Sequence, residues 1–300
     1  MKPISHILCP VDFSEISELT LQETGKLAEK LSAKLTLLHV VSVIPASYGA
    51  LYGIDFQAVD TVELTNSAAK ALEEFRLKYV PESVKCRVVS VTGNVSSEIN
   101  TEVKQSEVDL IVMATSGAHG VEEYLIGSNA AKVSRSATCP VLTASHPEKL
   151  SNISKVLIPL DISLGIKEIR HLIESFKGLE NFSAELLVIS EPGFKDPHPD
   201  ATRLFMESQI KALHATGIET VTWKEIFSKD VAETICTHAE KENFGMIMMK
   251  SLGRSTFGKF LLGSTTEAVV NHSSIPVLTL KTSARENHER FSSSIAPNLW

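Results

Sequence analysis

An internal repeat of about half the chain length is the feature that most constrains how this protein can fold. The sequence ILCPVD at residues 7–12 returns as VLIPLD at residues 156–161. Residues 127–143 also match residues 263–279 without a gap, from a Gly-Ser pair to a Pro-Val-Leu-Thr segment. Short sequence periods build solenoids, whereas a period this long in a chain of 300 residues indicates two copies of one domain.

The boundaries of the two copies follow from where the repeat stops. We predict a first domain at residues 1–147 and a second at residues 151–282, joined by a polar stretch that contains Pro147. Residues 283–300 are polar and Ser-rich, and we expect them to form a flexible tail.

Short apolar runs alternate with helical periodicity along each copy. Runs that are apolar along their whole length are typical of strands buried on both faces, as in a parallel sheet covered by helices. The fold class predicted is therefore α/β, doubly wound. The expected strands lie at residues 7–11, 35–41, 86–91, 110–113 and 141–143, and at 156–160, 184–189, 221–226, 246–249 and 277–280.

The first helix is the most clearly marked of the predicted helices. Ser14 can cap its amino terminus, because a serine hydroxyl accepts a hydrogen bond from the backbone of the first turn. Helical spacing then predicts that Ile16, Leu19, Leu27 and Leu31 share its buried face.

The ends of the predicted strands suggest where a ligand could bind. In an open parallel sheet, ligands bind beyond the carboxyl ends of the strands, where the strand order reverses. Asp12 ends the first strand, and Gly127 and Ser128 open the last helix of the copy. A carboxylate suits a base and a helix start suits phosphate, so the pattern fits a mononucleotide pocket. The alternative is that Asp12 braces the neighbouring turn and the glycines only permit a tight loop.

Four short motifs give the chain a family resemblance. Residues 10–14 (PVDFS), 38–40 (LHV) and 140–142 (PVL), with the loop that ends at Gly127 and Ser128, together resemble a universal stress protein. The resemblance covers nearly the whole chain, twice. It implies two tandem domains, each a five-stranded parallel sheet of order 3-2-1-4-5 with helices on both faces. It also implies an intramolecular pseudo-dimer through the last strands, at residues 141–143 and 277–279.

The glycine motif of nucleotide-binding family members, Gly-x2-Gly-x9-Gly-Ser/Thr, is altered in both copies. Counted back from Gly127, the second glycine is Gly117 and the first position holds Ala114. In the second copy the first position holds Lys250, a long side chain where the nucleotide should pass close to the backbone. In the second copy we also align Glu191 with Val40 of the first copy. We therefore expect a degenerate second pocket.

By resemblance, the first domain binds ATP or another adenine nucleotide (ADP or AMP), with Mg²⁺. The protein would then be a regulatory stress-response protein, at most a slow ATPase, with no catalytic residue identified. The alternative is a regulatory or scaffold protein in which both pockets are degenerate. It would act through protein partners that the sequence does not identify, or by forming a further homodimer. The implied binding residues are Pro10, Asp12, Val40, Met113, Ala114, Gly117, Gly127, Ser128 and Asn129.

Composition excludes several other classes of function. The net charge of -7 argues against nucleic acid as a partner, and no apolar run is long enough to cross a membrane. The four cysteines form no CxxC pair, which argues against a zinc site and for a reducing compartment. Residues 196–200 (DPHPD) hold potential metal ligands, but no second cluster completes a site. With no leader sequence evident, we expect a cytoplasmic protein.

Overall fold

The structure is a computed structural model, and its described residues cover most of both copies. Gly117 and Gly127 of the predicted site and the predicted tail at 283–300 lie outside the described residues. The described residues are 2–42, 61–115, 128–150, 153–162, 165–176, 182–252 and 263–282.

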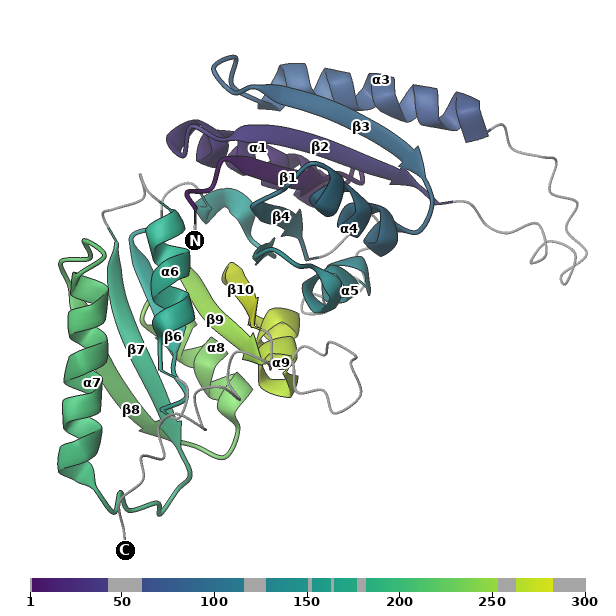
Figure 1. Cartoon of the computed structure of the whole chain (residues 1–300). Helices are drawn as coiled ribbons and strands as arrows, with labels where there is room; N and C mark the ends of the chain where they lie inside the picture. The colour runs from purple at the N-terminus through teal and green to yellow at the C-terminus, as the bar shows by residue number, and fades with distance from the viewer. Residues whose placement is uncertain are drawn as a thin grey trace, which may run out of the picture.

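Strands and helices alternate along both halves of the chain (Figure 1). The first half contains β1 (His6–Pro10), α1 (Glu15–Lys30), β2 (Lys34–Val41), α3 (Thr61–Tyr79), β3 (Cys86–Thr92), α4 (Val95–Gln105), β4 (Leu110–Ala114), α5 (Ser128–Ser136) and β5 (Val141–Ala144). After the short 3-10 helix η1 (Pro147–Lys149), the second half contains β6 (Lys155–Pro159), α6 (Lys167–Ser175), β7 (Ser183–Ser190), α7 (Pro199–His214), β8 (Val221–Phe227), α8 (Val231–Lys241), β9 (Met246–Leu252), α9 (Ser264–His272) and β10 (Val277–Thr282).

The described strands form one continuous ten-stranded sheet in the order β3-β2-β1-β4-β5-β10-β9-β6-β7-β8. Each half contributes a parallel sheet of order 3-2-1-4-5, which confirms the predicted topology. The halves meet where β5 pairs antiparallel with β10, and Leu142 lies opposite Leu278 at the centre of that pairing. The predicted pseudo-dimer contact is therefore confirmed at the strands expected to make it.

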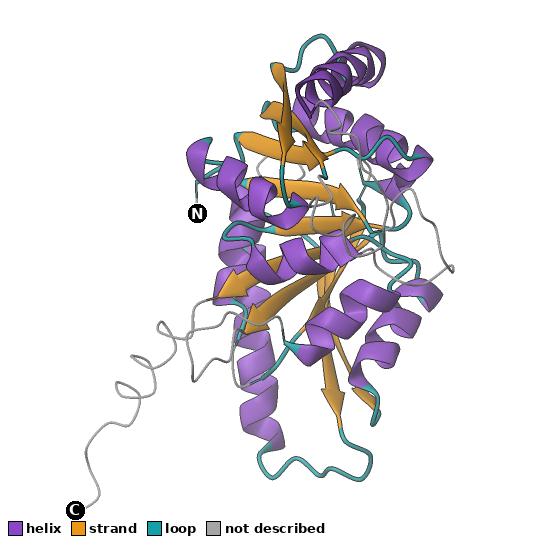
Figure 2. Cartoon of the chain, turned by 90° about the vertical axis from the view of Figure 1, so that its right-hand side faces the viewer, coloured by secondary structure: helices purple, strands orange, loops and turns teal. Residues whose placement is uncertain are grey.

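Helices cover both faces of the sheet (Figure 2). Side chains of α1, α3, α6 and α7 pack on one face, and those of α4, α5, α8 and α9 pack on the other. In each half, the helices that precede the edge strand (β3 or β8) lie on one face and those that follow it lie on the other, which is the doubly wound arrangement.

The two faces differ in how they join the halves. On the face of α1 and α6, the buried apolar residues form one cluster that runs through both halves. Leu27, Leu142 and Met248 line the same small apolar cavity there, and the Ile4 N–H donates to the Ser175 carbonyl at 2.9 Å. On the other face the cores stay separate, and α5 contacts α9 through an ion pair between Arg135 and Glu267 at 2.5 Å.

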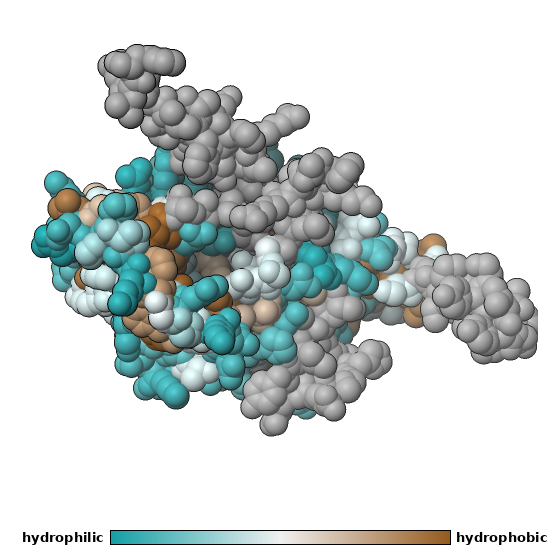
Figure 3. All heavy atoms as spheres, turned by 90° about the horizontal axis from the view of Figure 1, so that it is seen from below, coloured by the Kyte–Doolittle hydropathy of each residue, from teal (hydrophilic) through white to brown (hydrophobic). Residues whose placement is uncertain are grey.

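Exposed apolar side chains are scattered over the described surface. Leu204 on α7 is 60% exposed and Phe227 at the end of β8 is 53% exposed. The view from below shows brown apolar residues interspersed among teal polar ones (Figure 3). No helix among the described residues is both long and apolar enough to span a bilayer.

Candidate functional site

In the first half the strand order reverses between β1 and β4, which are neighbours in the sheet. This place is the switch point of the sheet. After β1 the chain crosses to α1 on one face, and after β4 it reaches α5 on the other. The elements that follow β1 and β4 thus lie on opposite faces, and ligands of such folds usually bind between the two connections. The predicted residues Pro10 and Ala114 are the last residues of β1 and β4, so both lie at this edge.

Asp12 lies just beyond β1 and is exposed. Its Oδ1 accepts hydrogen bonds from the Ser14 backbone N–H at 3.1 Å and from the Ser14 hydroxyl at 2.6 Å. Its own N–H donates to the Ser17 hydroxyl at 3.2 Å, and Ser14 caps α1 as predicted. No described residue forms a hydrogen bond with the second oxygen, Oδ2. One carboxylate oxygen therefore braces the turn, and the other is not used by the residues that the structure describes.

Phe13, which follows Asp12, has a φ of 62°. This left-handed region is rare for bulky side chains, because Cβ crowds the following carbonyl oxygen. Its ring centroid lies 4.6 Å from that of His39 and 5.1 Å from that of Phe75, which meets it edge-on. Sequence reasoning missed Phe13, because the sign of φ is fixed by tertiary contacts that the sequence does not list.

An apolar floor lies behind the strand ends. Val40 on β2 and Met113 on β4 are buried in one cluster with Ala130 from the first turn of α5. The start of α5 is thus packed on the strands that end at the switch point. Ser128 is the first residue of that helix, and Asn129 is exposed. The loop between β4 and α5, with Gly117 and Gly127, lies outside the described residues.

The second half differs at the corresponding edge. Lys250 occupies the position of Ala114, since Met249 pairs with Thr279 as Met113 pairs with Thr143. Its Nζ donates to Glu168 Oε2 on the first turn of α6 at 2.9 Å, and the side chains are 8% and 15% exposed. The lysine therefore points onto α6 inside the protein, where the first half has only a methyl group.

Two further details separate the second edge from the first. The ladder between β9 and β10 continues to Leu252 and Thr282, whereas that between β4 and β5 ends at Ala114. The alignment of Val40 with Glu191 is wrong. Pro10 pairs with Leu38 and Pro159 with Leu187, so the counterpart of Val40 is Ile189. The sequence marks the end of neither strand, and the strand pairing is what aligns the two copies residue by residue.

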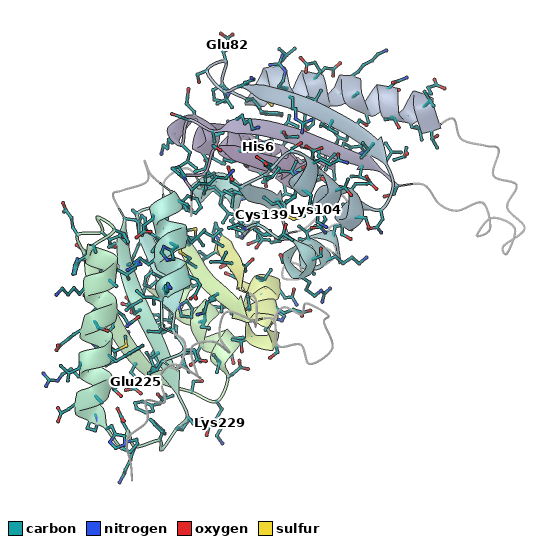
Figure 4. All side chains as sticks on the ribbon, in the orientation of Figure 1. His6, Glu82, Lys104, Cys139, Glu225 and Lys229 are labelled. Carbon is teal, nitrogen blue, oxygen red and sulfur yellow. The ribbon has the colours of Figure 1, made fainter. Side chains whose placement is uncertain are left out.

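A second polar cluster, also missed from sequence, lies at the opposite, amino-terminal edge of the first half (His6 is labelled in Figure 4). His6 Nδ1 lies 2.9 Å from the Ser106 carbonyl, and Nε2 lies 2.8 Å from the Thr36 hydroxyl. Arg87 donates to Thr36 Oγ1 and pairs with Glu102. Burial lowers the pKa of His6, and nearby Lys34 and Arg87 lower it further. Its side chain is satisfied within the fold and far along the strands from the switch point.

Other candidate groups have structural roles. Burial raises the pKa of the Cys9 thiol to about 12, so Cys9 is a poor nucleophile, as its place in a strand predicted. Asp196 Oδ1 accepts from the His198 backbone N–H at 2.8 Å, a local turn contact. His39 Nδ1 donates to the Val11 carbonyl at 2.7 Å, which confirms a packing histidine. Among the described residues, no three His, Cys, Asp or Glu side chains come together to hold a metal ion.

Known proteins resemble this chain over both halves. The universal stress protein family model matches residues 3–145 and 185–281. Universal stress protein YxiE of Bacillus subtilis is 30% identical over 141 residues, 45% of this chain and 95% of the relative. Universal stress protein Slr1230 of Synechocystis is 22% identical over 306 residues, 93% of this chain and 100% of the relative.

A solved structure agrees with the sequence matches. The crystal structure of a universal stress protein from Archaeoglobus fulgidus superposes with a TM-score of 0.71 at 22% identity, covering 92% of this chain and 98% of that chain. The family model passes over residues 146–184, which contain β6 and α6. Since it still matches most of both copies, the chain belongs to the universal stress protein family and carries that fold twice in tandem.

Proposed function

We propose that the first half binds an adenine nucleotide at its carboxyl edge and that the protein acts as a regulatory nucleotide-binding protein of the stress response. The observation that carries this proposal is the exposed Asp12 carboxylate, whose Oδ2 is not used by the described residues. It lies beside a switch point of a parallel sheet, the usual ligand position in such folds.

Each predicted residue has a role in this proposal. Asp12 Oδ2 accepts a hydrogen bond from an N–H group of the base, and Val40 and Met113 form the apolar floor behind it. The first turn of α5, with Ser128 and Asn129, faces the phosphates with its free backbone N–H groups. Pro10 and Ala114 form the strand ends, and Gly117 and Gly127 remain predictions for the loop. Mg²⁺ would bind through the nucleotide's phosphates.

The residues of the second half do not fit the same ligand. A nucleotide there would have to displace the Lys250 side chain from Glu168 and leave a carboxylate without its cation in a mostly buried position. We therefore assign one nucleotide site per chain. The rival function, a scaffold without nucleotide, is favoured by Ala114 at the first glycine position of the motif.

Isothermal titration of the full chain with ATP, ADP and AMP, with and without Mg²⁺, tests the proposal. We expect one saturable site per chain. Asp12→Asn keeps an oxygen that can brace Ser14 but replaces the other acceptor, so affinity should fall about tenfold, the loss expected for a charged hydrogen bond. Asp161→Asn, the matched change in the second half, should bind normally. Absence of saturation at millimolar nucleotide would establish the scaffold function instead.

A further inference from the structure

Phe13 sits between the two residues whose hydrogen bonds define the turn at the candidate site. The Ser14 N–H reaches Asp12 Oδ1 across this residue. The φ of Phe13 is therefore one of the backbone angles that set the geometry of this hydrogen bond and the direction of the Asp12 carboxylate.

A clamp of aromatic rings holds Phe13 in this conformation. Its ring lies between those of His39 on β2 and Phe75 on α3. Each partner is fixed in turn. His39 donates to the Val11 carbonyl at 2.7 Å, and Phe75 meets the ring of Tyr79 edge-on at 5.5 Å. The Tyr79 hydroxyl donates to Glu18 on α1 at 2.5 Å, so the clamp ties α1, β2 and α3 to the turn.

No such clamp forms among the described residues of the second half. The residue after Asp161 is Ile162, which is 38% exposed and is not among the described residues with positive φ. The strand register matches His39 with Val188, and equal spacing between helix and strand matches Phe75 with Ile210. Among the described residues, the aromatic clamp thus lies beside Asp12 and not at the second edge, where Lys250 pairs with Glu168.

We propose that Phe13 is a positioning residue, held in the left-handed region by His39 and Phe75 so that Asp12 Oδ2 points to the nucleotide. This inference rests on the proposed function and adds to it the residue that orients the Asp12 carboxylate. It also makes the packing of α3 a determinant of nucleotide affinity, although α3 contributes no residue to the predicted site.

Two substitutions separate positioning from simple packing. Asparagine visits the left-handed region readily but cannot replace the half-buried ring, whereas leucine fills apolar space but disfavours that region. Positioning predicts that Phe13→Leu weakens ATP binding about tenfold, whereas Phe13→Asn weakens it by less than about threefold. Thermal stability should follow the opposite order, with Phe13→Leu above Phe13→Asn. If affinity instead follows the order of stability, Phe13 is a packing residue and the inference is wrong.

A second measurement on the free protein keeps this test independent of nucleotide binding. The Ser14 amide resonance should shift when the Asp12 carboxylate is protonated, since that N–H donates to Oδ1. The response should persist in Phe13→Asn and disappear in Phe13→Leu, and Ile162→Asn should leave it unchanged. Lack of ATP binding by the wild type would refute the proposed function alone. Persistence of the response in Phe13→Leu would refute the positioning role itself.

Discussion

Phe13 combines a costly backbone conformation with contacts that offset the cost. The left-handed region costs an ordinary residue roughly 1–2 kcal/mol. Each aromatic pair contributes about 0.5–1.5 kcal/mol beyond its buried area, and Phe13 forms ring contacts with both His39 and Phe75. The two contributions are of similar size, so the turn persists only while both neighbours are in place.

His6 illustrates a different kind of constraint on a single residue, a fixed tautomer. Arg87 Nε–H donates to Thr36 Oγ1, so the threonine hydroxyl is free to donate to His6 Nε2. The Nδ1–H group of His6 then donates to the Ser106 carbonyl. A second ring proton would remove the acceptor that Thr36 uses, and the side chain is only 2% exposed. The fold therefore favours the neutral imidazole.

Stability should consequently fall in mild acid. The pKa of His6 is lowered in the folded state from its ordinary value of 6.5, so below that value the unfolded chain binds more protons than the folded one. This part of the unfolding free energy is complete above pH 6.5 and is lost as pH falls towards the folded pKa. Urea denaturation from pH 7.5 downwards should show a smaller decline for His6→Gln than for the wild type.

The matched control for this prediction is His146→Gln. His146 has a side chain that is 60% exposed and lies 3.7 Å from the exposed Glu148 carboxylate; such surface pairs contribute little, so His146→Gln should change the free energy of unfolding only slightly. Equal slopes for His6→Gln and wild type would show that His6 takes up its proton without cost in the folded protein.

Among the secondary-structure elements, strands were easier to predict than helix faces. The predicted strands agree with the observed ones to within a few residues, and the largest difference is β9, which continues to Leu252. The buried face of α1 was partly wrong, because Leu19 is 47% exposed while Thr20, Leu21 and Thr24 are buried. Strand burial on both faces is a property of composition, whereas the rotation of a helix depends on what covers it. The core that runs through both halves covers α1 more widely than its leucines suggest.

The ion pair between β9 and α6 gives a prediction at this scale. Lys250→Met leaves Glu168 charged and mostly buried, and should lower the free energy of unfolding by about 3 kcal/mol. Adding Glu168→Leu should restore most of that loss, because an apolar pair of similar volume replaces a buried ion pair at little cost. Urea denaturation of both single variants and the double variant measures the coupling. A near-zero effect of Lys250→Met would mean that groups other than Lys250 stabilise the Glu168 carboxylate.

For the whole molecule, the continuous sheet joins two copies into one structure with unequal faces. The face of α1 and α6 shares a single core across the junction of β5 and β10, whereas the other face has two cores bridged by Arg135 and Glu267. Each half therefore depends on the other for part of its apolar burial.

Leu278→Ala should test this dependence. Leu278 is fully buried on β10 opposite Leu142, so its truncation should cost about 2–5 kcal/mol. Because the shared core spans the junction, hydrogen exchange should lose protection in β2 and β7 alike. Leu204→Ala on the exposed side of α7 should change stability by less than about 0.5 kcal/mol. Loss of protection in β7 alone would show that the halves unfold separately.

The sequence by itself determined the duplication, the doubly wound topology and the strands that join the copies. The duplication follows from the repeated segments, and the parallel sheet follows from strands that are apolar along their length. The strand order and the joining strands were implied by the resemblance to universal stress proteins. It also identified Asp12 as a strand end and Lys250 as a departure from the glycine motif. Both are local features, readable from neighbouring residues.

Only the tertiary structure decided what those side chains contact. Lys250 meets Glu168, 82 residues earlier in the chain, and Phe13 keeps its positive φ beside Phe75, which belongs to another helix. In the proposed positioning role, the brace from Asp12 to Ser14 depends in turn on that φ. Contacts between distant segments arise from packing, which is set by all neighbours at once and is not encoded in any short pattern.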